Sequence, residues 1–371
     1  MKLLILSSNN GGGHNSTAYA IKEYYEANGF EVVIRDSLSF LSENVSGIIS
    51  KSHSLVYRYL PQFADNSVLH LENKTSLYDE SHPLRQVIDL GKHHLRNYIL
   101  EQQFNTVICT HVFGAMILSV AIPKEDRSIH TAFVETDYCN SIGAANNNMD
   151  YHFLPHESLK PELIRNGVPE QTLVISGIPV KKRIRHPMDQ RAAKKLFGIP
   201  EDRYHIILMG GSMGCGPIPE LLGLLSERLS DIAHISLICG TNTHLEKQMK
   251  DRFSGHNNIH IFGYTDMAIL YASADLFVTK PGGISITEAA VLGLPMVLIN
   301  AVAGWESCNL KFFVDHEAAL SGDTEEELTA CCELLLRNKD KRDLISSNLL
   351  KLSHPDSTEI IFRTLEASEG I

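Results

Sequence analysis

The sequence predicts an α/β protein in which two Rossmann-like, doubly wound parallel-sheet domains face each other across a cleft. Short runs rich in Leu, Ile and Val alternate with longer amphipathic stretches, which is the pattern of parallel strands joined by helices. The runs are almost continuously apolar, as expected for strands covered on both faces. The pattern also restarts, because an apolar run leads into glycines after Ser7 and again after Met209. Each half therefore begins a new sheet.

The apolar runs predict the strands in order. In the first half they are 2–7, 31–35, 105–109, 129–134, 150–154 and 172–175, and in the second half 204–209, 234–239, 259–262, 275–278 and 295–299. Helices are expected between them, at 16–28, 84–103, 217–229 and 284–292. In doubly wound domains, ligands bind at the carboxyl ends of the strands.

A chain of 371 residues is long enough for two domains of about 150–200 residues each. The basic, proline-containing stretch near 177–190 is the expected linker. The N-terminal domain is therefore expected over 1–177 and the C-terminal domain over 178–354. The remaining helix, 355–371, is expected to pack back on the N-terminal domain.

The composition excludes several classes of function. A formal net charge of −11 and a pI near 5.9 argue against a nucleic-acid partner, which needs a clustered basic face. Seven cysteines without a C-x-x-C spacing predict neither a disulfide framework nor a metal site, and indicate a reducing, cytoplasmic compartment. No run approaches the roughly 18–20 apolar residues of a membrane span, and the short apolar run at the N-terminus is interpreted as a strand rather than a signal peptide.

A glycine-rich loop follows the first strand. The glycines at 11–13 let the backbone approach a ligand closely, and the following helix, expected to be capped by Asn15 or Ser16, favours an anion there. The loop has neither the P-loop spacing nor the G-x-G-x-x-G spacing. His14 lies at the mouth of the expected cleft, where an imidazole can act as a general base. A packed or capping histidine is the alternative.

A second loop of small residues runs from Gly210 to Gly214. It follows the strand at 204–209 and leads into a helix that opens at Pro217. Its composition suits a bound diphosphate. A plain tight turn of an α/β fold has the same composition and is the alternative.

The most informative segment runs from Asp275 to Asn309. A strand ends at Thr279, and Pro-Gly-Gly makes the turn into a helix whose first N–H groups, with Ser285, face an anion. Glu288 lies three residues after Ser285 and so on the same helical face, where a carboxylate can accept both hydroxyls of a ribose. A glutamate that only complements the helix dipole is the alternative.

These motifs resemble those of the diacylglycerol glycosyltransferases, the group of processive diglucosyl-diacylglycerol synthases and monogalactosyl-diacylglycerol synthases. More distantly, they resemble the N-acetylglucosaminyltransferase that makes the last peptidoglycan lipid precursor. The similar segments span most of the chain: GGGH at 11–14, Thr136-Asp137-Tyr138, Gly177 to Val180, GGSMG at 210–214, Gly263-Tyr264, KPGGISITEA at 280–289 and GWESCN at 304–309. The block at 280–289 is the most specific of them.

The resemblance implies a GT-B fold with an N-terminal acceptor-binding domain and a C-terminal domain that binds a UDP-sugar as co-substrate. It also implies an inverting single displacement without a metal or other cofactor, and the lack of a D-x-D motif agrees with this. A metal-free site must stabilise the leaving diphosphate with helix N-termini and hydroxyls. That role is expected of Ser212, Gly214, Gly283 and Ser285.

The resemblance assigns the donor-binding residues further. Glu288 is expected to hold the ribose, and the stretch from Gly263 and Tyr264 to Met267 to line the uracil. Glu306 and Asn309 are expected to read sugar hydroxyls. The whole donor set is Gly13, Gly211, Ser212, Gly214, Gly263, Tyr264, Met267, Lys280, Gly282, Gly283, Ser285, Glu288, Trp305, Glu306 and Asn309.

On the acceptor side, the resemblance makes His14 the base for the acceptor hydroxyl, with Asp137 as the rival base or as the group that orients it. The apolar stretch 38–71 occupies the place of a membrane-dipping, lipid-gripping element, and ordinary core helices are the alternative. It carries only Lys51 and Arg58 as basic residues for contact with anionic lipid.

The chain departs from the family pattern at three places. Trp305 stands where the family commonly has Gln, and Ser285 replaces the usual Thr. After Tyr138 the family offers a His and a Trp, whereas here residues 139–148 read CNSIGAANNN.

Three functions are compatible with these features. The first is a glycosyltransferase, peripheral on the inner face of the cell membrane, that makes mono- or diglycosyl-diacylglycerol from UDP-glucose or UDP-galactose. The second is a GT-B enzyme with a soluble or isoprenoid-linked acceptor. The third is a UDP-sugar-binding sensor that has lost catalysis, for which Trp305 is the main argument.

Overall fold

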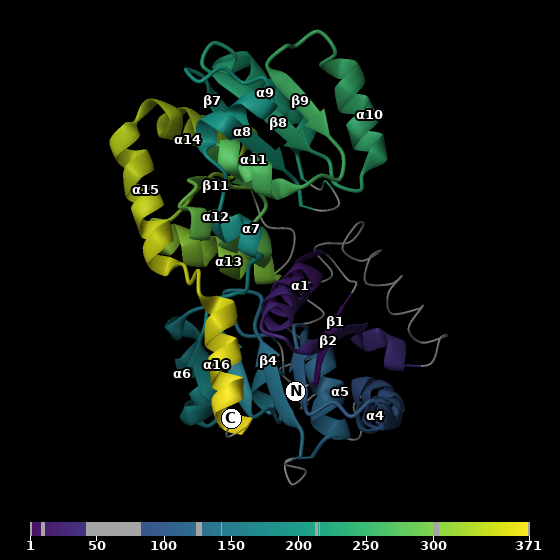
Figure 1. Cartoon of the computed structure of the whole chain (residues 1–371). Helices are drawn as coiled ribbons and strands as arrows, with labels where there is room; N and C mark the ends of the chain where they lie inside the picture. The colour runs from purple at the N-terminus through teal and green to yellow at the C-terminus, as the bar shows by residue number, and fades with distance from the viewer. Residues whose placement is uncertain are drawn as a thin grey trace. The chain divides into compact units, whose positions relative to one another are not determined.

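The computed structural model describes residues 2–8, 12–41, 83–123, 128–141, 143–211, 214, 216–299 and 304–369. The chain divides into two compact units (Figure 1). Unit 1 contains Met1–Lys181 together with His354–Ile371, and unit 2 contains Lys182–Ser353. The chain thus leaves unit 1 at Lys181, within the stretch expected to be the linker, and returns to it at His354.

Unit 1 contains a six-stranded sheet in the order β2-β1-β3-β4-β5-β6, and all of its strand pairs are parallel. The strands are β1 (Lys2–Ser7), β2 (Glu31–Asp36), β3 (Thr106–Cys109), β4 (His130–Val134), β5 (Tyr151–Leu154) and β6 (Leu173–Ile175). Each lies where the apolar runs predicted a strand. The central strand β1 is buried from its second to its last residue, as expected for a strand covered on both faces.

The helices of unit 1 come from both ends of the chain. They are α1 (Gly12–Ala27), α4 (Pro83–Glu101), α5 (Val112–Ala121), α6 (Lys160–Arg165) and α16 (Ser357–Glu369). α16 contacts α1, and its Phe362 packs edge-on against Tyr25 at 4.9 Å between ring centroids. Gly177 has φ +76°, and a Cβ there would lie 2.4 Å from the Cβ of His354. Glycine therefore lets the returning chain pass closely over the end of the sheet.

The start of α1 corrects one expectation. The helix begins at Gly12, so Asn15 and Ser16 lie inside it and do not cap it. The side chain of Asn15 instead bonds to β1: its Oδ1 accepts a hydrogen bond of 2.6 Å from Ser7 Oγ at the end of that strand. This bond ties the helix to the strand that precedes the glycine loop.

The stretch 38–71 is described only at its beginning. A 3₁₀ turn, Ser37–Phe40, is followed by Leu41, and Leu38, Phe40 and Leu41 are buried in the core with residues of α4 and α5. These three residues are core residues, as the alternative interpretation predicted. The rest of the proposed lipid-gripping element lies outside the described residues.

Unit 2 contains a second six-stranded parallel sheet, in the order β12-β11-β10-β7-β8-β9. Its strands are β7 (Tyr204–Met209), β8 (Ala233–Ile238), β9 (Ile259–Phe262), β10 (Leu276–Thr279), β11 (Met296–Leu298) and β12 (Leu320–Ser321). The sequence did not predict β12, because two half-buried residues give no periodicity. The predicted fold class, two Rossmann-like doubly wound α/β domains, is confirmed.

Nine helices of unit 2 are described. They are α7 (Lys182–Arg185), α8 (Gln190–Leu196), α9 (Ile218–Leu229), α10 (Thr243–Arg252), α11 (Met267–Ser273), α12 (Gly283–Leu292), α13 (Gly304–Asp315), α14 (Glu325–Arg337) and α15 (Lys339–Leu352). α9 starts directly after Pro217, as predicted. α12 is buried along most of its length and ends at Gly293, whose φ of +60° is the left-handed conformation that glycine adopts most readily.

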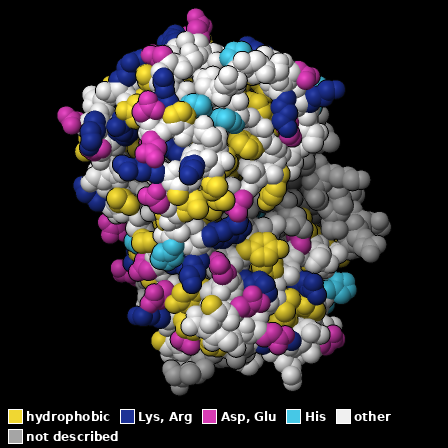
Figure 2. Space-filling view, turned by 45° about the horizontal axis from the view of Figure 1, so that its top comes forward, with side chains coloured by type: hydrophobic (Ala, Val, Ile, Leu, Met, Phe, Trp, Pro, Cys, Tyr) yellow, Lys and Arg dark blue, Asp and Glu magenta, His cyan; other side chains and the backbone are white. Residues whose placement is uncertain are grey.

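The described surface and helices bear on two further expectations. On the face drawn in Figure 2, Lys and Arg side chains are interspersed with Asp and Glu, so the described part of that face is not uniformly basic. None of the described helices combines the length and the apolar character needed to cross a bilayer. Six of the seven cysteines are described, and all six are free thiols.

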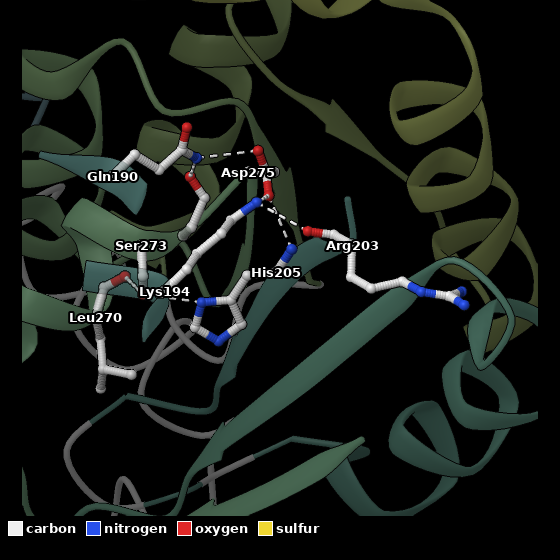
Figure 3. Close-up of polar contacts among 8 residues, drawn as sticks. Gln190, Lys194, Arg203, His205, Leu270, Ser273 and Asp275 are labelled. Carbon is white, nitrogen blue, oxygen red and sulfur yellow. Dashed lines mark hydrogen bonds and ion pairs between the residues drawn. The ribbon is translucent and has the colours of Figure 1, made fainter. Parts of the chain in front are cut away.

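A buried polar network surrounds His205 near the amino end of β7 (Figure 3). Ser273 Oγ donates to the Leu270 carbonyl at 2.7 Å, so it accepts from His205 Nδ1 at 2.9 Å. Burial lowers the pKa of His205 to about 3, so the imidazole is neutral. Because Nδ1 donates, Nε2 then accepts from Ser236 Oγ at 2.8 Å.

The strand end beside His205 is held by an ion pair. Asp275 Oδ2 accepts from the His205 backbone N–H and from Lys194 Nζ, at 2.8 and 2.7 Å. Lys194 also donates to the Arg203 carbonyl, and Gln190 donates to Asp275 Oδ1. The network lies at the end of the sheet opposite the carboxyl ends of the strands, so its role is to stabilise unit 2.

The stability of unit 2 is expected to fall as the pH drops below 6.5. Burial, followed by the charges of His260 and Lys194, lowers the pKa of His205 from 6.5 to about 3. In that window the unfolded chain binds a proton that the folded unit does not, so the free energy of unfolding decreases by about 1 kcal/mol per pH unit. Denaturant titrations at pH 7.5 and 5.5, followed by the fluorescence of Trp305, measure this slope.

The matched variant is His205→Gln, which keeps one donor and one acceptor but does not titrate. The neighbouring His234 and His260 also have lowered pKa values because of burial, so some slope remains in the variant. A slope equal to that of the wild type would contradict the role given to His205.

Candidate active site

Each sheet has one switch point, a pair of neighbouring strands from which the chain adds later strands first on one side and then on the other. In unit 2 the chain runs from β7 outward to β9 and then returns to β10 on the other side of β7. Thr279 at the end of β10 pairs with Met209 at the end of β7. The loops after these two strands therefore leave the sheet side by side, at the switch point where doubly wound folds bind ligands.

The described members of the predicted donor set in unit 2 follow the carboxyl ends of four strands. Gly211 and Gly214 follow β7, Gly263, Tyr264 and Met267 follow β9, Lys280, Gly282, Gly283, Ser285 and Glu288 follow β10, and Trp305, Glu306 and Asn309 follow β11. Because the strands are parallel, these segments share one edge of the sheet. Ser212 lies outside the described residues, and Gly13 belongs to α1 in unit 1.

Lys280 connects the loops after β7 and β10 with α13. Its Nζ lies 2.5 Å from Glu306 Oε1, and both side chains are largely shielded from solvent. Gly211 has φ +72°, and a Cβ there would lie 2.2 Å from Lys280 Cε. Glycine at 211 thus allows the lysine to lie across the loop and reach Glu306.

The turn before α12 is held from behind by Asn309. This side chain is fully buried, and its amide donates to the Pro281 carbonyl at 2.9 Å. Asn309 thus supports the turn, and its expected part in reading sugar hydroxyls stays a prediction. Glu306, one turn earlier in α13, is paired with Lys280.

The amino end of α12 has the features of an anion site. Its N-cap, Gly282, supplies no side-chain bond to the first N–H groups. Ser285 is half-buried in the first turn, and Glu288 is 9% exposed one turn further on. Tyr271 of α11, which the sequence motifs did not predict, has its hydroxyl buried beside Glu288 and Ser285. Burial and then the Glu288 carboxylate raise the pKa of Tyr271 well above its usual value, so the hydroxyl keeps its proton.

In the stretch after β9, the backbone of Gly263 makes a close contact and the ring of Tyr264 is exposed. A Cβ at Gly263 would lie 2.5 Å from Glu246 Oε2, so the backbone there lies against α10. Tyr264 is 84% exposed, and Met267 begins α11 behind the N-cap Asp266. An exposed aromatic ring at the carboxyl edge of the sheet is available for stacking on a base.

His14 lies at the corresponding switch point of unit 1, between β1 and β3. Its Nδ1 is 2.8 Å from the Thr110 carbonyl oxygen and 3.1 Å from Thr136 Oγ1. A carbonyl oxygen only accepts, so Nδ1 carries the proton and Nε2 carries the lone pair. This tautomer is the one that a general base needs.

Two residues that contact His14, His111 and Thr136, follow the ends of β3 and β4. His111 caps α5 by accepting from the Phe113 N–H at its Nδ1, and its ring meets the His14 ring edge-on at 4.6 Å. Thr136 and the half-buried Asp137 follow β4. The sequence analysis did not single out His111, although it follows a predicted strand end.

Comparisons with known proteins match one family model in each unit. The family model described as monogalactosyldiacylglycerol (MGDG) synthase matches residues 14–180, and the model described as glycosyltransferase family 28 C-terminal domain matches residues 205–341. The N-terminal part of the chain is thus similar to monogalactosyldiacylglycerol synthases, and the C-terminal part to family 28 glycosyltransferases. The predicted resemblance is thereby confirmed, and the two matches fall in units 1 and 2 respectively.

Relatives are similar over the whole chain. A processive diacylglycerol beta-glucosyltransferase of Bacillus pumilus is 26% identical over 375 residues, which cover 98% of this chain and 94% of the relative. MurG of Acinetobacter baumannii superposes with a TM-score of 0.64 at 15% identity, covering 99% of both chains. The UDP-GlcNAc 2-epimerase of Neisseria meningitidis, bound to UDP-GlcNAc, gives 0.65 at 15% identity and covers 99% of this chain and 100% of the epimerase. The predicted GT-B fold is thus confirmed.

Proposed function

We propose that this chain transfers glucose or galactose from a UDP-sugar to diacylglycerol or a glycosyl-diacylglycerol at a membrane surface. The observation that carries the proposal is the pair of family matches, one in each unit, combined with full-length similarity to a diacylglycerol beta-glucosyltransferase. The switch-point positions of His14 and of the turn at 280–283 support it.

For the donor, we propose that the amino end of α12 and the neighbouring loop at 210–214 hold the diphosphate. Glu288 accepts the ribose hydroxyls, and Tyr264 lies against the uracil. Lys280, held between Gly211 and Glu306, supplies positive charge beside the diphosphate. Fixed dipoles and one cation stabilise the leaving UDP without a divalent ion.

For the chemical step, His14 Nε2 takes the proton of the acceptor hydroxyl while the hydroxyl oxygen forms a bond to C1 of the sugar. The bond between C1 and the diphosphate oxygen breaks, and UDP leaves with the bonding electrons. A single displacement inverts the α linkage of a UDP-sugar, which agrees with the β product named for the relatives. Asp137 orients the acceptor or shares the role of base.

The decisive assay uses vesicles that contain diacylglycerol, with radiolabelled UDP-glucose or UDP-galactose as donor. Label in the lipid fraction is the expected result, and the better donor identifies the sugar. Release of UDP without labelled lipid would replace this proposal with a soluble or isoprenoid-linked acceptor. Tight UDP binding without either reaction would indicate a sensor instead of an enzyme.

The Gly211→Ala variant is expected to weaken UDP binding about tenfold, which corresponds to about 1.4 kcal/mol. Its new methyl group displaces the end of Lys280 and separates it from Glu306. Gly198→Ala is the matched control, because Gly198 has φ +66° but a methyl group there would have nothing within 4 Å. Both variants should lose similar stability, and only Gly211→Ala should bind UDP more weakly in calorimetry. Equal affinities in the two variants would remove Lys280 from the donor site.

A further inference from the structure

Glu135 is a fully buried carboxyl group that the proposed reaction does not use. It follows β4 directly and is 1% exposed. Its Oε1 accepts from the Thr136 N–H at 3.1 Å and from Ser141 Oγ at 2.7 Å, and its Oε2 accepts from the Ser141 N–H at 2.8 Å. Burying a carboxyl group costs free energy, and here three hydrogen-bond donors offset that cost. Such a fully satisfied buried carboxyl indicates a structural role.

These three bonds close the segment 136–141 into a loop. Thr136 is bound at its N–H by Glu135, and its hydroxyl lies 3.1 Å from His14 Nδ1. Asp137, the rival base, is the next residue and acts on Glu135 through its charge. One side chain thus fixes the backbone at Thr136, which contacts the proposed base, and constrains the loop that contains Asp137.

Burial disfavours the ionised form of Glu135, and the three hydrogen-bond donors favour it. Burial raises the pKa of Glu135 to about 8, the two bonds from Ser141 act to lower it, and the Asp137 carboxylate raises it further. Ser141 also lies in the segment 139–148, where this chain departs from the family pattern. The two bonds between Ser141 and Glu135 therefore involve a segment in which this chain differs from the family pattern.

We propose that Glu135 is a positioning residue: by closing the loop at 136–141 it holds Thr136 in place beside His14 and fixes Asp137 within the same loop. The expected change in kcat rests on the proposed function, whereas the expected change in the surroundings of His14 does not. It acts within unit 1 only, so the donor-binding residues of unit 2 are not part of it.

The test combines turnover with a spectroscopic signature of His14 in the full-length protein. Glu135→Gln places an amide where Ser141 offers a donor, and Ser141→Ala removes one of the three bonds while keeping the carboxyl. In both variants kcat should fall, by about 10- to 100-fold for Glu135→Gln and less for Ser141→Ala, because misplaced catalytic groups lose rate steeply. KM for the UDP-sugar and Kd for UDP should stay at wild-type values.

The signature is the set of imidazole NMR resonances of His14, assigned by their loss in His14→Ala. These resonances should move in both variants, whereas those of His205 in unit 2 should not. Ser158→Ala changes an exposed serine of unit 1 that bonds to His156, and this control should match the wild type in both readouts. If Glu135→Gln does not fold, kcat and the His14 resonances of Ser141→Ala test the role of Glu135 instead.

Wild-type positions of the His14 resonances in every folded variant would overturn the inference, as would wild-type kcat in both variants. If the wild type itself makes no glycolipid, the proposed function fails, and the resonances of His14 still decide the role of Glu135.

Discussion

Replacing His14 with alanine is expected to lower kcat by about 10²- to 10⁴-fold, the range typical of a positioned general base. The bond from Nδ1 to the Thr110 carbonyl keeps the lone pair on Nε2, so the wild-type side chain is ready to accept a proton. Alanine removes this acceptor and leaves the acceptor hydroxyl in its ordinary, weakly nucleophilic state. The rate of glycolipid formation at saturating UDP-sugar measures the loss.

The proposed contacts to UDP come from residues of unit 2, so UDP should bind His14→Ala with the affinity of the wild type. His14→Gln, which keeps a polar side chain but cannot act as a base, should be as slow as the alanine variant. Should either variant keep more than about a tenth of the wild-type kcat, the base lies elsewhere, and Asp137→Asn becomes the variant to examine.

Replacing Glu288 with alanine is expected to weaken UDP binding by about 10- to 100-fold, because a hydrogen bond to a charged group contributes about 1.5–3 kcal/mol. Glu288 is 9% exposed, and the protonated Tyr271 hydroxyl lies beside it, so its carboxylate is held in a defined position. The ribose is the part of the donor that this carboxylate is proposed to hold.

A modified ligand separates a ribose contact from a general disturbance of the site. The wild type should bind UDP more tightly than 2′,3′-dideoxy-UDP, and Glu288→Ala should lose this preference. Glu325→Ala, in the first turn of α14, removes a helix carboxylate outside the proposed site and should bind both ligands as the wild type does. A preference for UDP that survives in Glu288→Ala would place the ribose elsewhere.

Hydrophobic periodicity predicted the fold closely because parallel strands are local, nearly continuous apolar runs. It failed where the deciding contact is distant in sequence. Asn15 lies inside α1 and accepts a bond from Ser7 at the end of β1, and β12 is an edge strand that pairs with β11. Neither feature leaves a pattern in its own segment.

The site residues divide in the same way. Glycine loops and Glu288 stand in recognisable motifs, and the topology brings the described ones to the carboxyl edge of a sheet. Glu135 and Tyr271 were missed because their neighbours only appear after folding: Ser141 closes back over Glu135, and Tyr271 reaches α12 from α11. His111 could have been found, because it follows the predicted strand next to β1.

The central claim is that the segment at 280–288 binds UDP through helix dipoles, Lys280 and Glu288, without a divalent cation. Calorimetric titration of the wild-type protein with UDP, once in excess chelator and once in magnesium, tests it most directly. We expect binding of one UDP per chain with similar affinity in both buffers. Binding that occurs only in magnesium, or no binding in either buffer, would contradict the account.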